Sequence, residues 1–191
     1  MSDKTPSAAA GADLDAVLAK FAGTSDGAIG TCPYPVNEPM IHHWCDAIGD
    51  RNPVYLDREL AKRSAHGRLV APPAMLQAWT MRGLRPDTPE EAAAKKSAAD
   101  RKSVLQVLDE AGYTSVVATN CEQEYFRYLE PGDQLTHTVE VESVSPEKKT
   151  GLGIGRFLSQ LYTFRDAKGE VVGTMRFRIL KFRPPSQEKG A

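Results

Sequence analysis

The sequence has no long apolar run, no excess of either charge and no paired-cysteine motif. No apolar segment approaches the roughly 20 residues that cross a bilayer, and the start lacks a charged-then-apolar signal pattern, so neither a membrane span nor export is predicted. The 24 basic and 25 acidic residues give a formal net charge of −1. That balance offers nucleic acid or an anionic membrane no electrostatic attraction, so neither is an expected partner.

The cysteines are few and widely spaced. Cys32, Cys45 and Cys121 form no CxxC pair, which argues against a disulfide framework and against zinc. His42 and Cys45 have helical spacing, but two ligands without others do not make a metal site. We therefore expect reduced thiols, a cytoplasmic location and no metal.

The 191 residues suit one domain with tails. Residues 1–12 are small and polar, which predicts a disordered tail. The ordered domain is expected over 13–183. Residues 184–191 hold prolines followed by polar and small residues, which predicts a tail or a linker to a C-terminal domain missing from this chain.

The first half of the domain has helical patterns. Spacing of apolar residues predicts amphipathic helices over 14–23 and 38–50, and few charges over 71–84 predict a third helix that is buried nearly all round. The polar stretch 84–112 predicts a helical insertion, with the helix over 88–112. The expected apolar face of the second helix comprises Met40, Ile41, Trp44, Ala47 and Ile48.

After Gly112 the pattern changes to strands, with branched and aromatic residues and explicit turns between them. The expected strands are 113–128, 134–145, 155–166 and 171–183, with a further edge strand in 28–36. An apolar helix followed by antiparallel strands predicts an α+β hot-dog fold, a curved antiparallel sheet wrapped round a central apolar helix. Because an unpaired edge strand invites aggregation, we expect a second hot-dog subunit to continue the sheet.

One short stretch carries candidate chemistry: GDRNPVYLD, residues 49–57. By itself it fits a helix stop followed by a turn. With HGRLVAPPAMLQAW (66–79) and FRYLEPGDQL (126–135) downstream, it resembles the MaoC-like hydratase family of the hot-dog superfamily, over about residues 30–183. That family adds water to the double bond of an enoyl thioester, using an aspartate and a histidine that both hold the water.

The resemblance assigns a role to several positions of this sequence. Asp50 stands at the acid/base position, Asn52 at the supporting position, and Gly67 at the amide that faces the thioester carbonyl. Tyr55 stands where the family has histidine, and a phenol with a pKa near 10 is a poor base at neutral pH. We therefore expect no catalytic residue in this chain.

The departure at Tyr55 resembles two-chain family members, in which one subunit carries the Asp/His pair and its partner has lost it. The similarity is greatest to the MaoC-like N-terminal domain of the larger, non-catalytic subunit of heteromeric steroid enoyl-CoA hydratases of cholesterol side-chain degradation. It implies a heterotetramer with a smaller subunit that carries Asp-x-Asn-Pro-x-His, and a thiolase-like aldolase bound through the missing C-terminal domain. Coenzyme A enters as part of the substrate, with no other cofactor.

Other positions are candidates for substrate contacts. Arg68 is expected to contact a coenzyme A phosphate or a partner chain. Weaker candidates for the phosphates, on a solvated helix face, are Lys95, Lys96, Arg101 and Lys102. Met75 and Trp79 fit the core first and an acyl pocket second.

Four functions stay open on the sequence: a hydratase subunit that depends on a partner, a self-sufficient hydratase or dehydratase using Asp50, and a non-catalytic acyl-CoA-binding or enzyme-recruiting module. The fourth is a hot-dog thioesterase, which is less favoured because hydrolysis needs a differently placed carboxylate.

Overall fold

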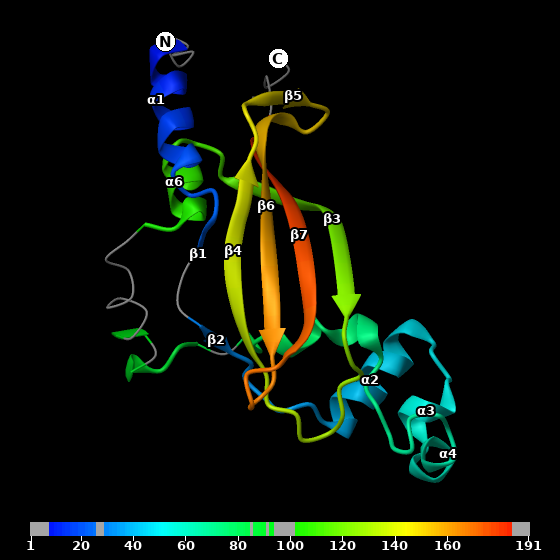
Figure 1. Cartoon of the computed structure of the whole chain (residues 1–191). Helices are drawn as coiled ribbons and strands as arrows, with labels where there is room; N and C mark the ends of the chain where they lie inside the picture. The colour runs from blue at the N-terminus through cyan, green and yellow to red at the C-terminus, as the bar shows by residue number, and fades with distance from the viewer. Residues whose placement is uncertain (1–7, 26–28, 85, 91, 94–101, 185–191) are drawn as a thin grey trace.

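The computed structural model describes residues 8–25, 29–84, 86–90, 92–93 and 102–184. Within them, seven strands form one antiparallel sheet in the order β1-β4-β6-β7-β3, with β2 also paired to β4 and β5 to β6 (Figure 1). The strands are β1 (Thr24–Ser25), β2 (Gly30–Thr31), β3 (Ser115–Tyr125), β4 (Thr136–Val144), β5 (Lys148–Thr150), β6 (Gly153–Arg165) and β7 (Val171–Arg183). The strands predicted after Gly112 are confirmed, and the expected edge strand is the two-residue β2.

The helices are short and lie at the two ends of the sheet (Figure 1). They are α1 (Ala8–Ala19), α2 (Glu38–Ile48), α3 (Pro53–Leu56), α4 (Arg58–Lys62) and α6 (Val104–Glu110), with 3-10 turns η1 (Pro73–Met75) and η2 (Ala78–Thr80). Helix α1 begins at Ala8, within the segment 1–12 that the sequence assigned to a tail. Residues 1–7 and 185–191 lie outside the described part of the chain.

Helix α2 confirms the helix predicted over 38–50, but not its whole apolar face. Ile41 and Cys45 are buried, whereas Ala47 is exposed and Ile48 has 58% of its surface exposed. The buried residues of the helix lie in its first two turns. The prediction that Ala47 and Ile48 belong to the buried face is therefore wrong.

The central apolar helix predicted over 71–84 is not an α-helix. The hydrogen bonds of η1 and η2 run from residue i+3 back to residue i, such as Leu76 N–H to the Pro73 carbonyl at 3.1 Å. The pair Pro72–Pro73 lacks N–H donors, and the Thr80 hydroxyl donates to the Gln77 carbonyl at 2.8 Å, which favours a tight turn over a continuing helix. The prediction of burial is right for Met75, Leu76 and Trp79, each at most 2% exposed, but wrong for residues 81–84, which are exposed.

The helix predicted over 88–112 is also not continuous. Residues 102–103 are non-helical, and Ser103 caps α6 in a capping box with Gln106. Lys95, Lys96 and Arg101 lie outside the described residues, while Lys102 pairs with Glu110 at 2.7 Å. The described helical residues of this segment are 89–90 and 92–93 at its start and α6 at its end, and α6 begins with its own cap.

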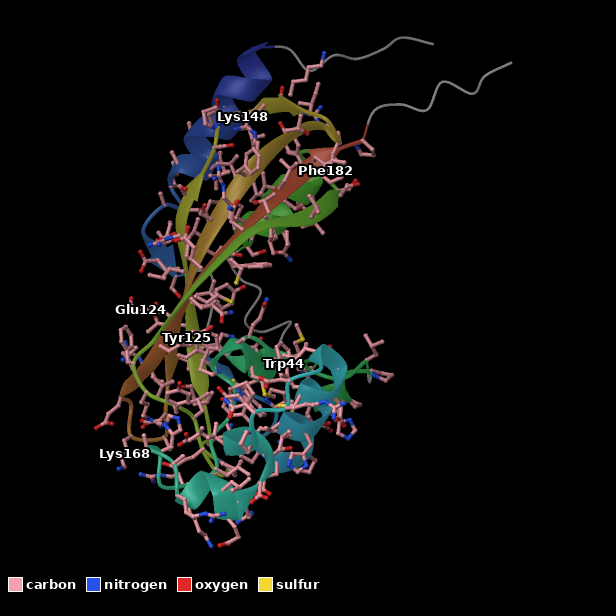
Figure 2. The ribbon with its side chains drawn as sticks, turned by 90° about the vertical axis from the view of Figure 1, so that its right-hand side faces the viewer. Trp44, Glu124, Tyr125, Lys148, Lys168 and Phe182 are labelled. Carbon is pink, nitrogen blue, oxygen red and sulfur yellow. The ribbon has the colours of Figure 1, made fainter. Side chains whose placement is uncertain are left out.

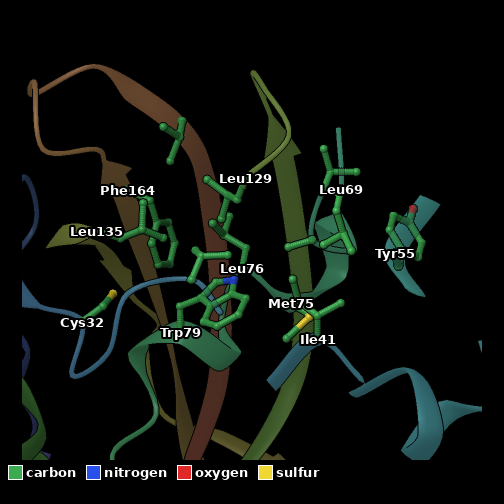
Figure 3. Packing of buried hydrophobic residues seen from close by; sticks show 14 of the residues in the cluster. Cys32, Ile41, Tyr55, Leu69, Met75, Leu76, Trp79, Leu129, Leu135 and Phe164 are labelled. Atoms are coloured by element: carbon green, nitrogen blue, oxygen red, sulfur yellow. The ribbon is translucent and has the colours of Figure 1, made fainter. Parts of the chain in front are cut away.

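Two apolar clusters cover the same face of the sheet. The first joins α2, η1 and η2 to Leu135, Phe164 and Met175, and Figure 3 shows its centre around Trp79. The second joins α1 and α6 to Val141, Leu158 and Ile179. Leu158 and Phe164 are an even number of residues apart on β6, so their side chains lie on one face. That face is the inner face of the hot-dog, with helical cover at both ends.

Candidate functional site

The segment 49–57 is built from consecutive helix caps. Gly49 ends α2 in the left-handed region with φ 72°, and Asn52 caps α3 by accepting the Val54 N–H at 3.2 Å. Asp57 caps α4 by accepting the Glu59 and Leu60 N–H groups. The local pattern therefore folds as the helix stop and turn that the sequence also allowed.

Asp50 serves this turn as well. Its Oδ1 accepts the Asn52 N–H at 2.9 Å, an Asx-turn that fixes the start of the loop. Among the described residues, no histidine side chain is recorded in a hydrogen bond with the Asp50 carboxylate. The position keeps its acid but not the imidazole that would share a water with it.

Tyr55 fills the histidine position as a buried neutral phenol, with 9% of its surface exposed. Burial raises the pKa of Tyr55, and the nearby acidic groups of Tyr128, Asp50 and Cys45 raise this pKa further. The phenol therefore stays protonated near neutral pH. It can donate a hydrogen bond beside Asp50 but cannot act as a general base.

His66 does not replace the missing imidazole. Its ring lies 4.3 Å from the ring of Tyr128, centroid to centroid, and the two share the lining of a pocket of about 350 Å³. Tyr128 in turn lies close enough to Tyr55 to perturb its pKa. His66 thus contacts Tyr128, and among the described residues no hydrogen bond joins His66 to the Asp50 carboxylate.

Gly67 does not present a free amide in this conformation. It has φ 67°, which favours glycine, and its N–H donates to the Ser64 carbonyl at 3.1 Å. The turn after α4 therefore uses the amide that the sequence assigned to the thioester carbonyl.

Arg68 lies at the rim of the 350 Å³ pocket. Its guanidinium donates to both oxygens of Glu130, at 3.1 and 2.9 Å, and its side chain is 64% exposed. An exposed pair of this kind contributes at most about 1 kcal/mol, so a phosphate could displace Glu130 at low cost. The geometry is compatible with the predicted contact to coenzyme A.

Met75 and Trp79 belong to the core. Each is 1% exposed and packed within the first apolar cluster. The Trp79 Nε1 is buried with no hydrogen-bond partner among the described residues. Neither residue lines any of the described pockets. The two are therefore placed as core residues, the first of the two roles that the sequence offered.

Sequence reasoning missed Arg127, whose ion pairs join two turns of the chain. Arg127 pairs with Asp133 at 2.7 Å and with Asp166 at 3.2 Å, which ties the turn before β4 to the turn before β7. Hydrogen bonding to Asp133 raises the pKa of Arg127, against the opposing effect of burial. The adjacent turn residues in FRYLEPGDQL were the available signal, but Asp166 is 39 residues away and only the fold brings it close.

Comparisons with known proteins place the chain in a family. Residues 26–175 match the family model "FAS1-like, dehydratase domain region". The chain belongs to this FAS1-like dehydratase family. It is also 39% identical to a chain of the ChsH1-ChsH2 complex from Mycobacterium tuberculosis, with a TM-score of 0.74 and coverage of 93% of this chain and 95% of that one. The resemblance to MaoC-like hydratases and the hot-dog fold are thereby confirmed.

Two curated relatives are described as alpha subunits. The chain is 47% identical over 179 residues to a probable enoyl-CoA hydratase alpha subunit from Thermomonospora curvata, covering 94% of this chain and 55% of that protein. It is 45% identical over 150 residues to the 3-oxo-4,17-pregnadiene-20-carboxyl-CoA hydratase alpha subunit from Mycobacterium tuberculosis, covering 78% and 46%. The chain therefore spans about half the length of these relatives.

The described part of the chain has no group of three or more His, Cys, Asp or Glu side chains that could hold a metal ion. The same residues include no helix that is long and apolar enough to span a bilayer.

Proposed function

We propose that this chain is a subunit of a heteromeric enoyl-CoA hydratase whose partner subunit supplies the Asp/His pair. The reaction adds water across the α,β double bond of an enoyl thioester and yields a 3-hydroxyacyl thioester. The observation that carries the proposal is the buried phenol of Tyr55 beside Asp50, where the family's chemistry needs an imidazole. The alpha-subunit relatives support the same assembly.

We propose a bulky substrate of the steroid side-chain class. The short turns η1 and η2 stand where a long central helix was expected. A smaller part of the inner face of the sheet is therefore covered. On β3, Cys121, Gln123 and Tyr125 pair with β7 residues of that inner face, and Cys121 and Tyr125 are exposed. The inner face near β3 thus offers space that a compact acyl chain would not need.

We propose that Arg68 binds a phosphate of coenzyme A and releases Glu130 on doing so. Arg68→Ala should raise the KM of the assembled enzyme for the acyl-CoA about tenfold. The same substitution should leave KM unchanged for the acyl-pantetheine thioester, which has no nucleotide phosphates. An equal rise for both substrates would place the effect in the fold of the loop and contradict the phosphate contact.

The wider assembly belongs to the same proposal. The partner is a smaller hot-dog subunit with Asp-x-Asn-Pro-x-His, the complex is a heterotetramer, and a thiolase-like aldolase binds a C-terminal domain joined through residues 184–191. We propose a cytoplasmic setting, which the unpaired thiols of Cys32, Cys45 and Cys121 support, and coenzyme A as part of the substrate with no other cofactor.

The test is hydration of a steroid enoyl-CoA by three samples: this chain, the candidate partner and their mixture. We expect robust turnover from a complex that contains both chains and none from this chain alone. Turnover by this chain alone that is lost in Asp50→Asn would favour the self-sufficient hydratase. Tight acyl-CoA binding by a homodimer, with no partner conferring turnover, would favour the binding module.

A further inference from the structure

Strand β3 is an open edge of the sheet. It pairs with β7 along one side, and no described strand pairs with its other side. Val116 and Val117 on this strand are 58% and 37% exposed. Figure 2 looks onto this side of the molecule, with Glu124 and Tyr125 labelled near the end of the strand. The backbone N–H and C=O groups on this side and the exposed apolar side chains favour pairing with a further strand.

The two halves of the open edge carry different kinds of side chain. Its first half is small or apolar, from Ser115 to Ala118, and its second half carries Glu122 and Glu124. No lysine or arginine lies within Ser115–Tyr125. Glu122 is 69% exposed and touches Arg176 at 3.2 Å, while Arg176 also holds Glu142 at 2.7 Å. No described basic side chain is recorded in an ion pair with Glu124. The second half therefore has an uncompensated negative charge.

This division disfavours a symmetric pair of two copies. In an antiparallel twofold pairing centred on the second half of β3, glutamates face glutamates, and like charges on opposed strands destabilise the pairing. In a pairing centred on the middle of the strand, the glutamates of each copy lie beside the apolar half of the other and lose hydration without gaining a partner. Neither register gives both the apolar half and the glutamate half of β3 a matching partner.

We infer that Glu122 and Glu124 select a different hot-dog chain over a second copy of this one. The inference rests on the proposed function and defines the chemistry of its partner. The partner's edge strand carries lysine or arginine opposite Glu122 and Glu124 and apolar residues opposite Val116 and Val117. Opposite charges then stabilise the mixed pair, and the same glutamates exclude the homodimer.

The test compares two doubly substituted chains of equal charge. The edge variant, Glu122→Lys with Glu124→Lys, reverses the charge along β3. The control variant, Glu140→Lys with Glu170→Lys, makes the same change in charge at exposed positions away from β3. Each is titrated against the purified candidate partner, and circular dichroism confirms folding. We expect the edge variant to bind at least about tenfold more weakly and the control to bind within about twofold of the parent chain. Replacing the partner's opposing basic residues by glutamate should restore binding to the edge variant.

Three results would overturn the inference: equal weakening by both variants, a parent chain that forms a stable homodimer through β3, or a partner edge strand without lysine or arginine. The readout is binding, so it is separate from turnover. A tight complex that fails to hydrate enoyl-CoA contradicts the proposed function and leaves the rule for pairing intact. A complex that hydrates enoyl-CoA, but whose affinity does not change when the edge charges are reversed, contradicts the pairing rule alone.

Discussion

At the scale of single residues, close contacts between atoms limit the size of the side chain that a position can hold. Gly30 on β2 lies opposite His137 on β4, and a Cβ at residue 30 would lie 2.4 Å from His137 Cε1. Burial lowers the pKa of His137, and its ring packs near Tyr162 and Phe164 at 6.1 and 6.0 Å. The neutral imidazole is thus held between aromatic rings and a backbone that leaves no room for a methyl group.

Gly30→Ala should therefore destabilise the protein by about 1–3 kcal/mol, because His137 or β2 must move. Gly83→Ala is the matched control, since its Cβ would meet nothing within 4 Å and its φ is not in the left-handed region. It should change the free energy of unfolding by no more than about 0.5 kcal/mol. Urea denaturation of both variants measures the difference, and equal stabilities would show that the ring shifts freely.

The sequence shows an acid at residue 50 and a phenol at residue 55, but it does not show what these side chains contact. The structure adds the bond from the Asn52 N–H to Asp50 and the burial of Tyr55. Whether Gly67 offers an amide depends on a backbone turn, and its N–H is already bound to Ser64. The contact of Arg127 with Asp166 joins two turns across the sheet, which no local pattern records.

At the scale of elements, caps define the ends of helices more sharply than periodicity does. The polar stretch 84–112 predicted a helix over 88–112, but Ser103 starts a new one by capping α6. The low charge of 71–84 predicted a buried helix, but residues 81–84 are exposed and the buried part forms 3-10 turns, because burial does not specify the hydrogen-bond pattern. The strands were predicted well because alternation and explicit turns agree there.

Ser103→Ala should cost about 1 kcal/mol, because the Gln106 N–H loses its acceptor and the capping box is broken. Ser103→Asp keeps a side-chain oxygen at the cap and should stay close to the parent stability. Thermal unfolding of the two variants separates these outcomes. A stable alanine variant together with an unstable aspartate variant would contradict the capping role.

At the scale of the whole molecule, the chain is a hot-dog unit in which β3 is an edge strand of the described sheet and Tyr55 is buried beside the Asp50 loop. The curved sheet and its strand composition were predictable, since they follow from sequence alternation. The charges along β3 could not be placed at an edge from the sequence, because their exposure depends on the fold. The central proposal is that this chain keeps the position of the reactive pair but not its function.

The most direct test is the kcat of the assembled hydratase with one aspartate replaced at a time. Asp50→Asn in this chain keeps an oxygen for the Asn52 N–H, so the loop should keep its shape. We expect kcat within about threefold of the parent complex, whereas the matching Asp→Asn change in the partner should lower it at least about a hundredfold. A hundredfold loss on Asp50→Asn in this chain would show that Asp50 takes part in the chemistry and would contradict the account.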